Sequence, residues 1–294
     1  MRRPTILLTG ADGQVGFELV RSLAAHGEVI ALNRAALDLA DADAIVASVR
    51  QARPQLIVNA AAYTAVDRAE SERDVAFAVN ARAPGIFAEE AKRLDAVLIH
   101  YSTDYVFDGR RTTPYDEEAP TGPLNVYGAS KLDGERAIKQ SDARAIVFRT
   151  SWVYGARGSN FLLTMLRLAK ERDELRIVAD QHGTPNWCRT LADATTSAVA
   201  RGLPWLAERA GLYHLASSGS TTWHGFAQAI IGDAPRPRVV GIATSDYPTP
   251  ARRPAYGVLA TRKFEATFGC TMPDWRDALA ACRSAMMEVP RGAN

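Results

Sequence analysis

Tyr127 and Lys131 are the residues whose types and spacing most directly suggest acid–base chemistry. They stand four apart in the stretch YGASK, near the start of a helical pattern over residues 124–140, so they share one face of a helix. A phenol ordinarily titrates at about pH 10 and is a poor acid or base at neutrality. We expect the Lys131 ammonium to favour the phenolate and bring Tyr127 into working range. Such a pair alone is usually a solvated surface pair, so its meaning depends on its neighbours.

A strand end supplies hydroxyl groups next to this pair. The segment YSTDYVFDG closes an apolar run and places Ser102 and Thr103 at its end. Either hydroxyl could hold a substrate oxygen beside Tyr127, which would complete a site for proton transfer.

Three glycines near the N-terminus suggest a nucleotide site. The run LLTGADGQVG places Gly10, Gly13 and Gly16 between an apolar strand and a helical pattern over residues 14–25. Glycines there let backbone N–H groups approach a pyrophosphate, whose charge the helix N-terminus favours. The GxxGxxG spacing differs from the better-known GxGxxG, and ordinary strand-to-helix turns also use glycine. Together with the Tyr–Lys pair, the glycines predict a nicotinamide dinucleotide site.

The elements that must position these residues alternate between strands and helices. Short apolar runs are separated by helical patterns, which indicates a parallel sheet covered on both faces. This is an α/β fold with a doubly wound, Rossmann-like sheet. We predict a dinucleotide-binding domain over residues 1–150 and a smaller, mainly substrate-binding lobe over 151–294, with about 175–217 returning to the first domain. The runs are 5–10, 28–33, 55–61, 96–102 and 143–151, and the helical patterns are 14–25, 42–52, 73–94 and 124–140.

Composition limits the partners of the chain. The 294 residues are 47% hydrophobic and carry a net charge of +2, which indicates neither nucleic acid nor membrane as a partner. Three distant cysteines favour a reducing compartment, so we expect a cytoplasmic protein. We expect the chain to be a monomer or a homodimer. We expect no catalytic metal, because the five histidines lack metal-ligand spacing: His26, His100, His182, His214 and His224.

Eight segments of the chain resemble one enzyme family in matching order, from about Ile6 to about Arg253. On these segments the chain resembles the extended short-chain dehydrogenase/reductases and, among them, the dTDP-4-dehydrorhamnose reductase family. The Tyr–Lys pair is shared by the whole superfamily, whereas STDYVF together with RTSWVYG is much more specific. The segments are GQVG, VNAAAYTAVDRAES, HYSTDYVFDG, PLNVYGASKL, FRTSWVYG, NFLLTMLRLAKER, LYHLASSGSTTWHGFA and YPTPARRP.

The resemblance implies NAD(P)H-dependent reduction of the 4-keto group of dTDP-4-dehydro-β-L-rhamnose, giving dTDP-L-rhamnose. In the family's mechanism Tyr127 would protonate the carbonyl oxygen, Lys131 would bind the nicotinamide ribose, and Thr103 would adjust the proton transfer. Asp104 and Trp152 match positions that contact the sugar. The residues expected at the cofactor, besides Tyr127 and Lys131, are Gly10, Asp12, Gly13, Gln14, Val15, Gly16, Asn33, Arg34, Asp38, Leu39, Ala60, Ala61, Ala62 and Thr64.

Some of these positions also have structural interpretations. Asp38 could cap the next turn, and Trp152 could belong to the core. Arg253, which follows YPTPA with Arg252, could grip the substrate diphosphate with two hydrogen bonds or could lie in a solvated basic loop.

The end of the second strand bears on the choice of cofactor. Asn33 stands where an NAD-selective site would place a carboxylate for the ribose 2′-hydroxyl, and Arg34 follows it. A missing anion and an adjacent cation favour a 2′-phosphate, so we predict a preference for NADPH, with NADH possible. Arg34 could equally be an exposed surface charge.

Two further details concern magnesium and a helix kink. Some family members bind magnesium through acidic residues at a dimer contact, but in TPNWCRTLAD no carboxylate precedes Asp193, which puts magnesium in doubt. Pro84 lies inside a helical pattern and cannot donate to the carbonyl of Asn80. We interpret the free Asn80 carbonyl as binding a water molecule that would connect Lys131 to solvent for proton transfer.

Two other functions remain open from the residues alone. A nucleotide-sugar epimerase or dehydratase would share the fold, the glycines and the Tyr–Lys pair, but would regenerate its cofactor in a closed cycle. A non-catalytic NADP-binding regulatory subunit, like the one associated with methionine adenosyltransferase, would share the fold as well. The intact Thr103, Tyr127 and Lys131 argue against a purely binding role.

Overall fold

The core of the molecule is a six-stranded parallel sheet. The computed structural model describes residues 3–232 and 236–288, so the outermost ends of the two predicted domains, 1–2 and 289–294, lie outside it. The strands lie in the order β10-β5-β4-β3-β1-β2. All six are parallel, and the order in which the chain adds them reverses between β1 and β3, as in a doubly wound fold. The strands are β1 Thr5–Thr9, β2 Glu28–Leu32, β3 Leu56–Asn59, β4 Val97–Thr103, β5 Ala145–Thr150 and β10 Gly211–His214.

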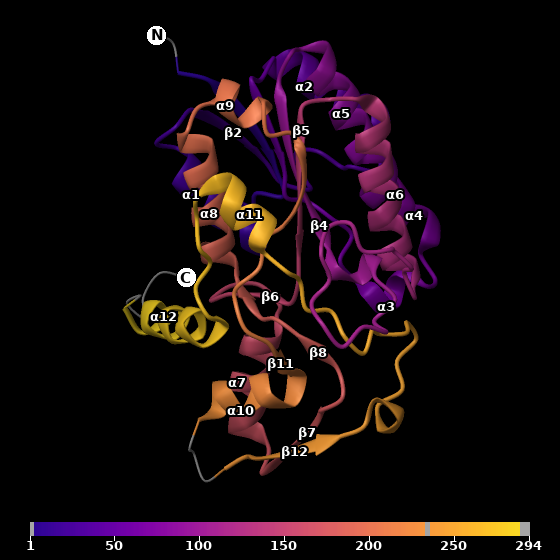
Figure 1. Cartoon of the computed structure of the whole chain (residues 1–294), viewed down its shortest axis with the longest axis vertical. Coiled ribbons are helices and arrows are strands. Elements are labelled where there is room, and N and C mark those ends of the chain that lie inside the picture. The colour runs from indigo at the N-terminus through magenta and orange to yellow at the C-terminus, as the bar shows by residue number, and fades with distance from the viewer. Residues whose placement is uncertain (1–2, 233–235, 289–294) are drawn as a thin grey trace.

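Helices cover both faces of this sheet (Figure 1). In β1, Ile6 and Leu8 face one side and Leu7 faces the other, because side chains alternate along a strand. All three are fully buried, which explains the continuous apolar runs. One face packs on α1 Gln14–Leu23, α8 Cys188–Ala200, α9 Leu203–Ala207 and α11 Arg262–Phe268; the other packs on α2 Ala42–Ala52, α5 Ala83–Arg93 and α6 Val126–Ser141.

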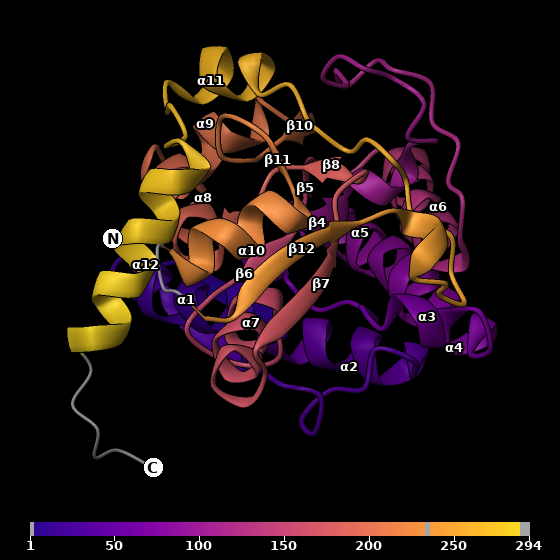
Figure 2. The same ribbon diagram turned by 90° about the horizontal axis from the view of Figure 1, so that it is seen from below.

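A smaller set of elements lies beyond the carboxyl ends of the strands (Figures 1 and 2). Its separate core includes Leu162, Phe226 and Trp275, all nearly inaccessible to solvent. The helices here are α7 Phe161–Glu171, α10 Trp223–Ile231 and α12 Trp275–Glu288, with the short η3 Thr244–Asp246. Three two-stranded sheets complete it: β6 Val153–Tyr154 with β9 Asn186–Trp187, β7 Glu174–Val178 with β12 Arg238–Ile242, and β8 His182–Gly183 with β11 Thr221–Thr222.

The helical pattern over residues 73–94 is interrupted rather than simply kinked. Helix α4 Arg73–Phe77 passes into a π-helical turn, η1 Ala78–Arg82, before α5 begins with Pro84 in its first turn. A wide π turn accommodates the missing proline donor. The Asn80 carbonyl packs so close to Gly134 of α6 that a Cβ there would lie 2.1 Å from the oxygen. Two further short helices are α3 Val66–Ala69, which follows β3, and η2 Asp104–Val106, which follows β4.

Candidate active site

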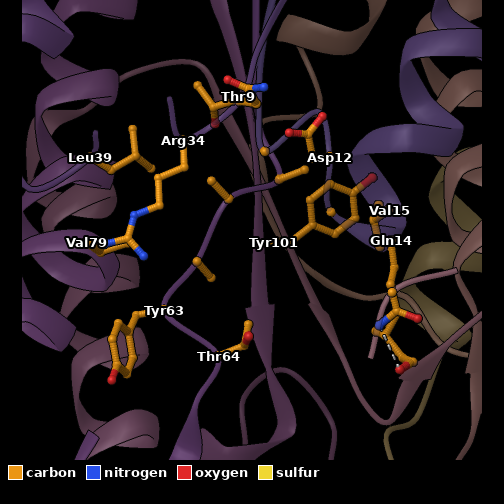
Figure 3. Close-up of a pocket in the computed structure, with 18 of the residues that line it drawn as sticks. Thr9, Asp12, Gln14, Val15, Arg34, Leu39, Tyr63, Thr64, Val79 and Tyr101 are labelled. Atoms are coloured by element: carbon orange, nitrogen blue, oxygen red, sulfur yellow. Dashed lines mark hydrogen bonds between the residues drawn. The ribbon is translucent and has the colours of Figure 1, made fainter. Parts of the chain in front are cut away.

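A cavity of about 590 Å³ opens at the carboxyl ends of β1–β5 (Figure 3). Such a position, at the point where strand order reverses, is where doubly wound folds bind ligands. Most of the residues expected at a cofactor line it together: Gly10, Asp12, Gly13, Gln14, Val15, Asn33, Arg34, Asp38, Leu39, Ala60, Ala61, Ala62, Thr64, Tyr127 and Lys131. Gly16, Thr103, Asp104, Trp152 and Arg253 are not among its lining residues.

The glycine loop forms because two backbone segments cross within contact distance. Gly10 has φ of +76°, and a Cβ on it would lie 2.8 Å from the Ala61 nitrogen. A Cβ on Gly16 would lie 2.0 Å from the Gly10 carbonyl oxygen, so Gly16 acts inside α1 by allowing this approach. The N-terminus of α1 therefore faces the cavity directly, which suits an anionic group.

The loop after β3 is fixed by one amide side chain. Asn80 Oδ1 accepts the Tyr63 N–H (2.9 Å) and Asn80 Nδ2 donates to the Tyr63 carbonyl (3.0 Å) and to Ser130 Oγ (3.0 Å). These hydrogen bonds fix the loop at Tyr63, and Ala60–Thr64 form one wall of the cavity. The sequence interpretation gave Asn80 a role through its carbonyl, whereas the structure gives its side chain these hydrogen bonds.

At the end of β2, Arg34 extends toward Val79 (Figure 3). Asn33 Oδ1 accepts the Ala36 N–H at 3.0 Å, and Asp38 Oδ1 accepts the Ala40 N–H at 3.0 Å. Asp38 therefore has the local turn contact anticipated for it as well as a place on the cavity wall. The end of β2 therefore presents the Arg34 guanidinium and the Asn33 amide to the cavity, and not a carboxylate.

Burial dominates the acid–base behaviour of Tyr127 and Lys131. Burial raises the pKa of Tyr127 to about 12, while the nearby Thr103 hydroxyl acts in the opposite direction. Burial lowers the pKa of Lys131 to about 8, opposed by the Glu135 carboxylate. Lys131 is not among the groups that shift the pKa of Tyr127 here, and the net shift is upward because burial dominates. The Lys131 Nζ instead donates to the Tyr101 carbonyl (2.6 Å) and lies 3.2 Å from His100 Nε2.

The hydroxyl and carboxyl groups after β4 form a second buried cluster. Ser102 Oγ donates to Glu135 (2.5 Å), so this hydroxyl is already engaged. Thr103 Oγ1 accepts the Tyr105 N–H (3.1 Å) and donates to Asp104 Oδ1 (3.0 Å). Asp104 Oδ2 has no hydrogen-bond partner within the described residues, and burial raises the pKa of Asp104 to about 7.

Trp152 and Arg253 lie outside the cavity wall. Trp152 has φ of +43° and stacks on Trp223, with ring centroids 3.6 Å apart and planes at 10°. A non-glycine residue in this conformation carries strain that packing must hold in place. Arg253 donates to Asp67 (2.8 Å) and to the Ala251 carbonyl (2.8 Å), so part of its guanidinium is already engaged within the protein.

Sequence reasoning missed a group of residues that reach the cavity only through tertiary packing. Tyr63 and Val79 arrive from the loop and the π turn held by Asn80. Gly158 and Ser159 come from the segment before α7, where Gln14 Nε2 donates to the Val153 carbonyl at 3.3 Å. The additional lining residues are Thr9, Leu37, Tyr63, Val75, Val79, Tyr101, Thr150, Val153, Gly158 and Ser159; Ser102, already expected beside Tyr127, also lines the cavity.

The segment that resembles a magnesium site holds an internal ion pair. Arg189 Nε donates to Glu18 at 3.1 Å, and the guanidinium lies over the Trp187 ring. Within the described ranges, 3–232 and 236–288, no group of three or more His, Cys, Asp or Glu side chains could hold a metal ion. No helix in the same ranges combines the length and apolar character needed to cross a membrane.

Comparison with known proteins decides the family. The profile of the RmlD substrate binding domain matches residues 4–287. A protein of Burkholderia thailandensis named dTDP-4-dehydrorhamnose reductase is 51% identical over 289 residues, covering 94% of this chain and 97% of that protein. The chain belongs to the dTDP-4-dehydrorhamnose reductase family. A protein of Escherichia coli K12 with the same name is 45% identical over 282 residues, covering 92% and 94%.

Solved structures agree with this assignment. The dTDP-4-dehydrorhamnose reductase of Bacillus anthracis in complex with NADP superposes with a TM-score of 0.90 at 34% identity, covering 97% of this chain and 100% of that one. The UDP-glucose 4-epimerase of Thermus thermophilus in complex with NAD gives 0.80 at 19% identity, which shows the shared fold alone. The α/β, Rossmann-like fold of an extended short-chain dehydrogenase/reductase is thus confirmed.

Asp104 gives a testable pH dependence. Its carboxyl stays protonated in the folded state up to about pH 7, whereas it ionises in the unfolded state at about pH 4. Stability is therefore lost as the pH rises between these values, and Asp104→Asn should unfold at a higher temperature than wild type at pH 8 but not at pH 4. The gain is at most about 4 kcal/mol, at about 1.4 kcal/mol per pKa unit.

A neighbouring carboxylate provides the matched control. Asp108 has a lowered pKa, because it accepts hydrogen bonds from the Arg110 N–H (3.1 Å) and the Tyr115 hydroxyl (2.8 Å). Asp108→Asn should therefore lower the unfolding temperature at pH 8. Equal unfolding temperatures of Asp104→Asn and wild type at both pH values would contradict the raised pKa of the buried Asp104 carboxyl.

Proposed function

We propose that this chain uses NADPH to reduce the 4-keto group of dTDP-4-dehydro-β-L-rhamnose, giving dTDP-L-rhamnose. The observation that carries the proposal is that Tyr127 and Lys131 line the same cavity as the glycine loop, in a member of this family. The B. thailandensis and E. coli relatives bear the name of this activity.

The cavity fits a nicotinamide dinucleotide by its chemistry. Backbone N–H groups around Gly10 and the N-terminus of α1 suit the pyrophosphate. Arg34 suits a 2′-phosphate, and Leu39 offers an apolar surface for a base at the same end. The B. anthracis relative was solved with NADP. The proposed cofactor contacts are those fifteen lining residues named above, with Gly16 supporting the loop.

The chemistry of reduction matches the protonation of Tyr127. When bound, the reduced nicotinamide supplies a hydride to the carbonyl carbon. Tyr127, whose pKa is about 12, keeps its proton at neutral pH and donates it to the oxygen on which charge develops. Thr103, whose hydroxyl lowers the pKa of the phenol, would adjust this transfer, and Lys131 would hold the ribose. Asp104, Trp152 and Arg253 are proposed to face the sugar nucleotide from beyond the cavity.

We also propose a division of labour along the chain. Residues 1–150, joined by elements within about 175–217, would bind the dinucleotide, and the remainder of 151–294 would bind the substrate. In support, β10 pairs with β5, and α8 packs beside α1 on the sheet. The separate apolar core around Phe226 supports an independent substrate lobe.

The activity is tested with Tyr127→Phe. With dTDP-4-dehydro-L-rhamnose, wild type should oxidise one NADPH per sugar, and the variant should lose on the order of a hundredfold or more in kcat, because the proton donor is gone. NADPH should still bind, as followed by its fluorescence, because the aromatic ring and the other cofactor contacts remain. Turnover of a sugar nucleotide without loss of NADPH absorbance would indicate an epimerase or dehydratase instead, and cofactor binding without any turnover would indicate a regulatory subunit.

Cofactor preference is tested with Arg34→Ser. Removing a charge-assisted hydrogen bond to the 2′-phosphate should lower kcat/KM for NADPH about ten- to a hundredfold and leave NADH unchanged. Arg110→Ser is the matched control, because Arg110 is exposed and away from the cavity wall. Equal efficiencies of the wild type with the two cofactors would remove the NADPH preference.

A further inference from the structure

One wall of the cavity comes from the later part of the chain and has no part in the reaction described above. Val153, Gly158 and Ser159 line the cavity. They lie between β5 and α7, within the residues proposed to bind the substrate. Their contacts with the glycine loop indicate which ligand they face.

Gln14 joins this wall to the glycine loop. It is the first residue of α1, it lines the cavity, and Figure 3 shows it on the side opposite Arg34. Its Nε2 donates to the Val153 carbonyl at 3.3 Å, and its Oε1 accepts from Asn160 Nδ2 at 3.0 Å. A carbonyl oxygen can only accept, so the amide nitrogen of Gln14 must face Val153 and its oxygen must face Asn160.

Asn160 closes the loop 155–159. Its Oδ1 caps α7 by accepting the Leu163 N–H at 3.1 Å, which leaves the amide nitrogen free to donate. This nitrogen donates to the carbonyls of Gly155 (2.9 Å) and Arg157 (3.0 Å) as well as to the first residue of α1. The loop is therefore held at its own ends and against α1 by one side chain.

The same loop carries a positive charge close to the start of α1. The Arg157 guanidinium lies over the Phe17 ring, 3.6 Å from its centroid, and Phe17 is the fourth residue of α1. Gly158 follows with φ of +73°, a left-handed conformation that suits glycine. A Cβ on Gly158 would lie 3.7 Å from Gln14 Cγ, so the loop lies against the start of α1.

We propose that the loop 155–159 forms the second side of the pyrophosphate site. The glycine loop offers backbone N–H groups on one side. Ser159 offers a hydroxyl donor from the cavity wall, and the Arg157 cation favours the same anion. This role rests on the proposed cofactor, and it gives the portion of the chain assigned to the substrate a share in the dinucleotide site.

The position of the loop separates the pyrophosphate from the 2′-phosphate. Arg34, which is proposed to meet the 2′-phosphate, lies across the cavity from Gln14 (Figure 3). NADPH and NADH share the pyrophosphate and differ only in the 2′-phosphate. A change in the loop 155–159 should therefore affect both dinucleotides to the same extent.

Ser159→Asp tests the contact directly. A carboxylate removes the hydroxyl donor and repels the pyrophosphate, so the dissociation constants of NADPH and NADH should each rise about tenfold or more. Both constants are measured by cofactor fluorescence with the full chain and without substrate. Ser284→Asp is the matched control, because Ser284 is exposed in α12 and away from the cavity wall, and it should leave both constants unchanged.

Asn160→Ser tests the hold on the loop without adding a charge. Serine can still cap α7, but it lacks the amide nitrogen that donates to Gln14, Gly155 and Arg157. Both dissociation constants should rise about three- to tenfold, with circular dichroism as the check that the variant is folded. Arg34→Ser, in contrast, should weaken the binding of NADPH alone.

The outcomes separate this role from the proposed activity. Unchanged binding of both dinucleotides to a folded Ser159→Asp protein would overturn the role of the loop, even if the chain reduces the sugar nucleotide. If that variant does not fold, unchanged binding to Asn160→Ser would do the same. A loss confined to NADPH would place the loop at the 2′-phosphate and contradict the pyrophosphate assignment. A wild type that binds neither dinucleotide would overturn both this role and the proposed cofactor.

Discussion

A buried polar group must find its hydrogen-bond partner within the protein, and this constraint shapes the edge of the sheet where β1, β3, β4 and β5 end. Thr9, Asn59 and His100 stand side by side on three adjacent strands and bond to one another. Lys131 joins them from α6 through His100 and the Tyr101 carbonyl. The Lys131 Nζ is therefore positioned by groups of β4.

The same burial separates the roles of the two residues that the proposed reaction uses. Burial raises the pKa of Tyr127 to about 12 and lowers that of Lys131 to about 8, so at neutral pH the phenol keeps its proton and Lys131 remains mainly an ammonium. A reductase needs an acid that still carries its proton when the hydride arrives, and a phenol of high pKa meets that need.

Much of this architecture could be predicted from the sequence, because it depends on local patterns. Alternating apolar runs and helices gave the parallel sheet, and Gly10, Tyr127 and Lys131 meet at one cavity as their strand ends and spacing indicate. What could not be predicted depends on long-range contacts. The hydrogen bond between Asn80 and Tyr63 joins residues 17 apart, and the contact of His100 with Lys131 joins residues 31 apart. In the sequence His100 is simply one residue of a predicted strand. Only the structure shows that its ring lies between Asn59 and Lys131.

The central claim is that hydride passes from the dinucleotide cavity to the sugar while Tyr127 supplies the proton. The most direct test uses NADPH carrying deuterium at the transferring position, with dTDP-4-dehydro-L-rhamnose as acceptor, and locates the label by mass spectrometry and proton resonance. One deuterium at C4 of the product sugar is the expected result. Product without label, or label retained on the cofactor after turnover, would contradict the account.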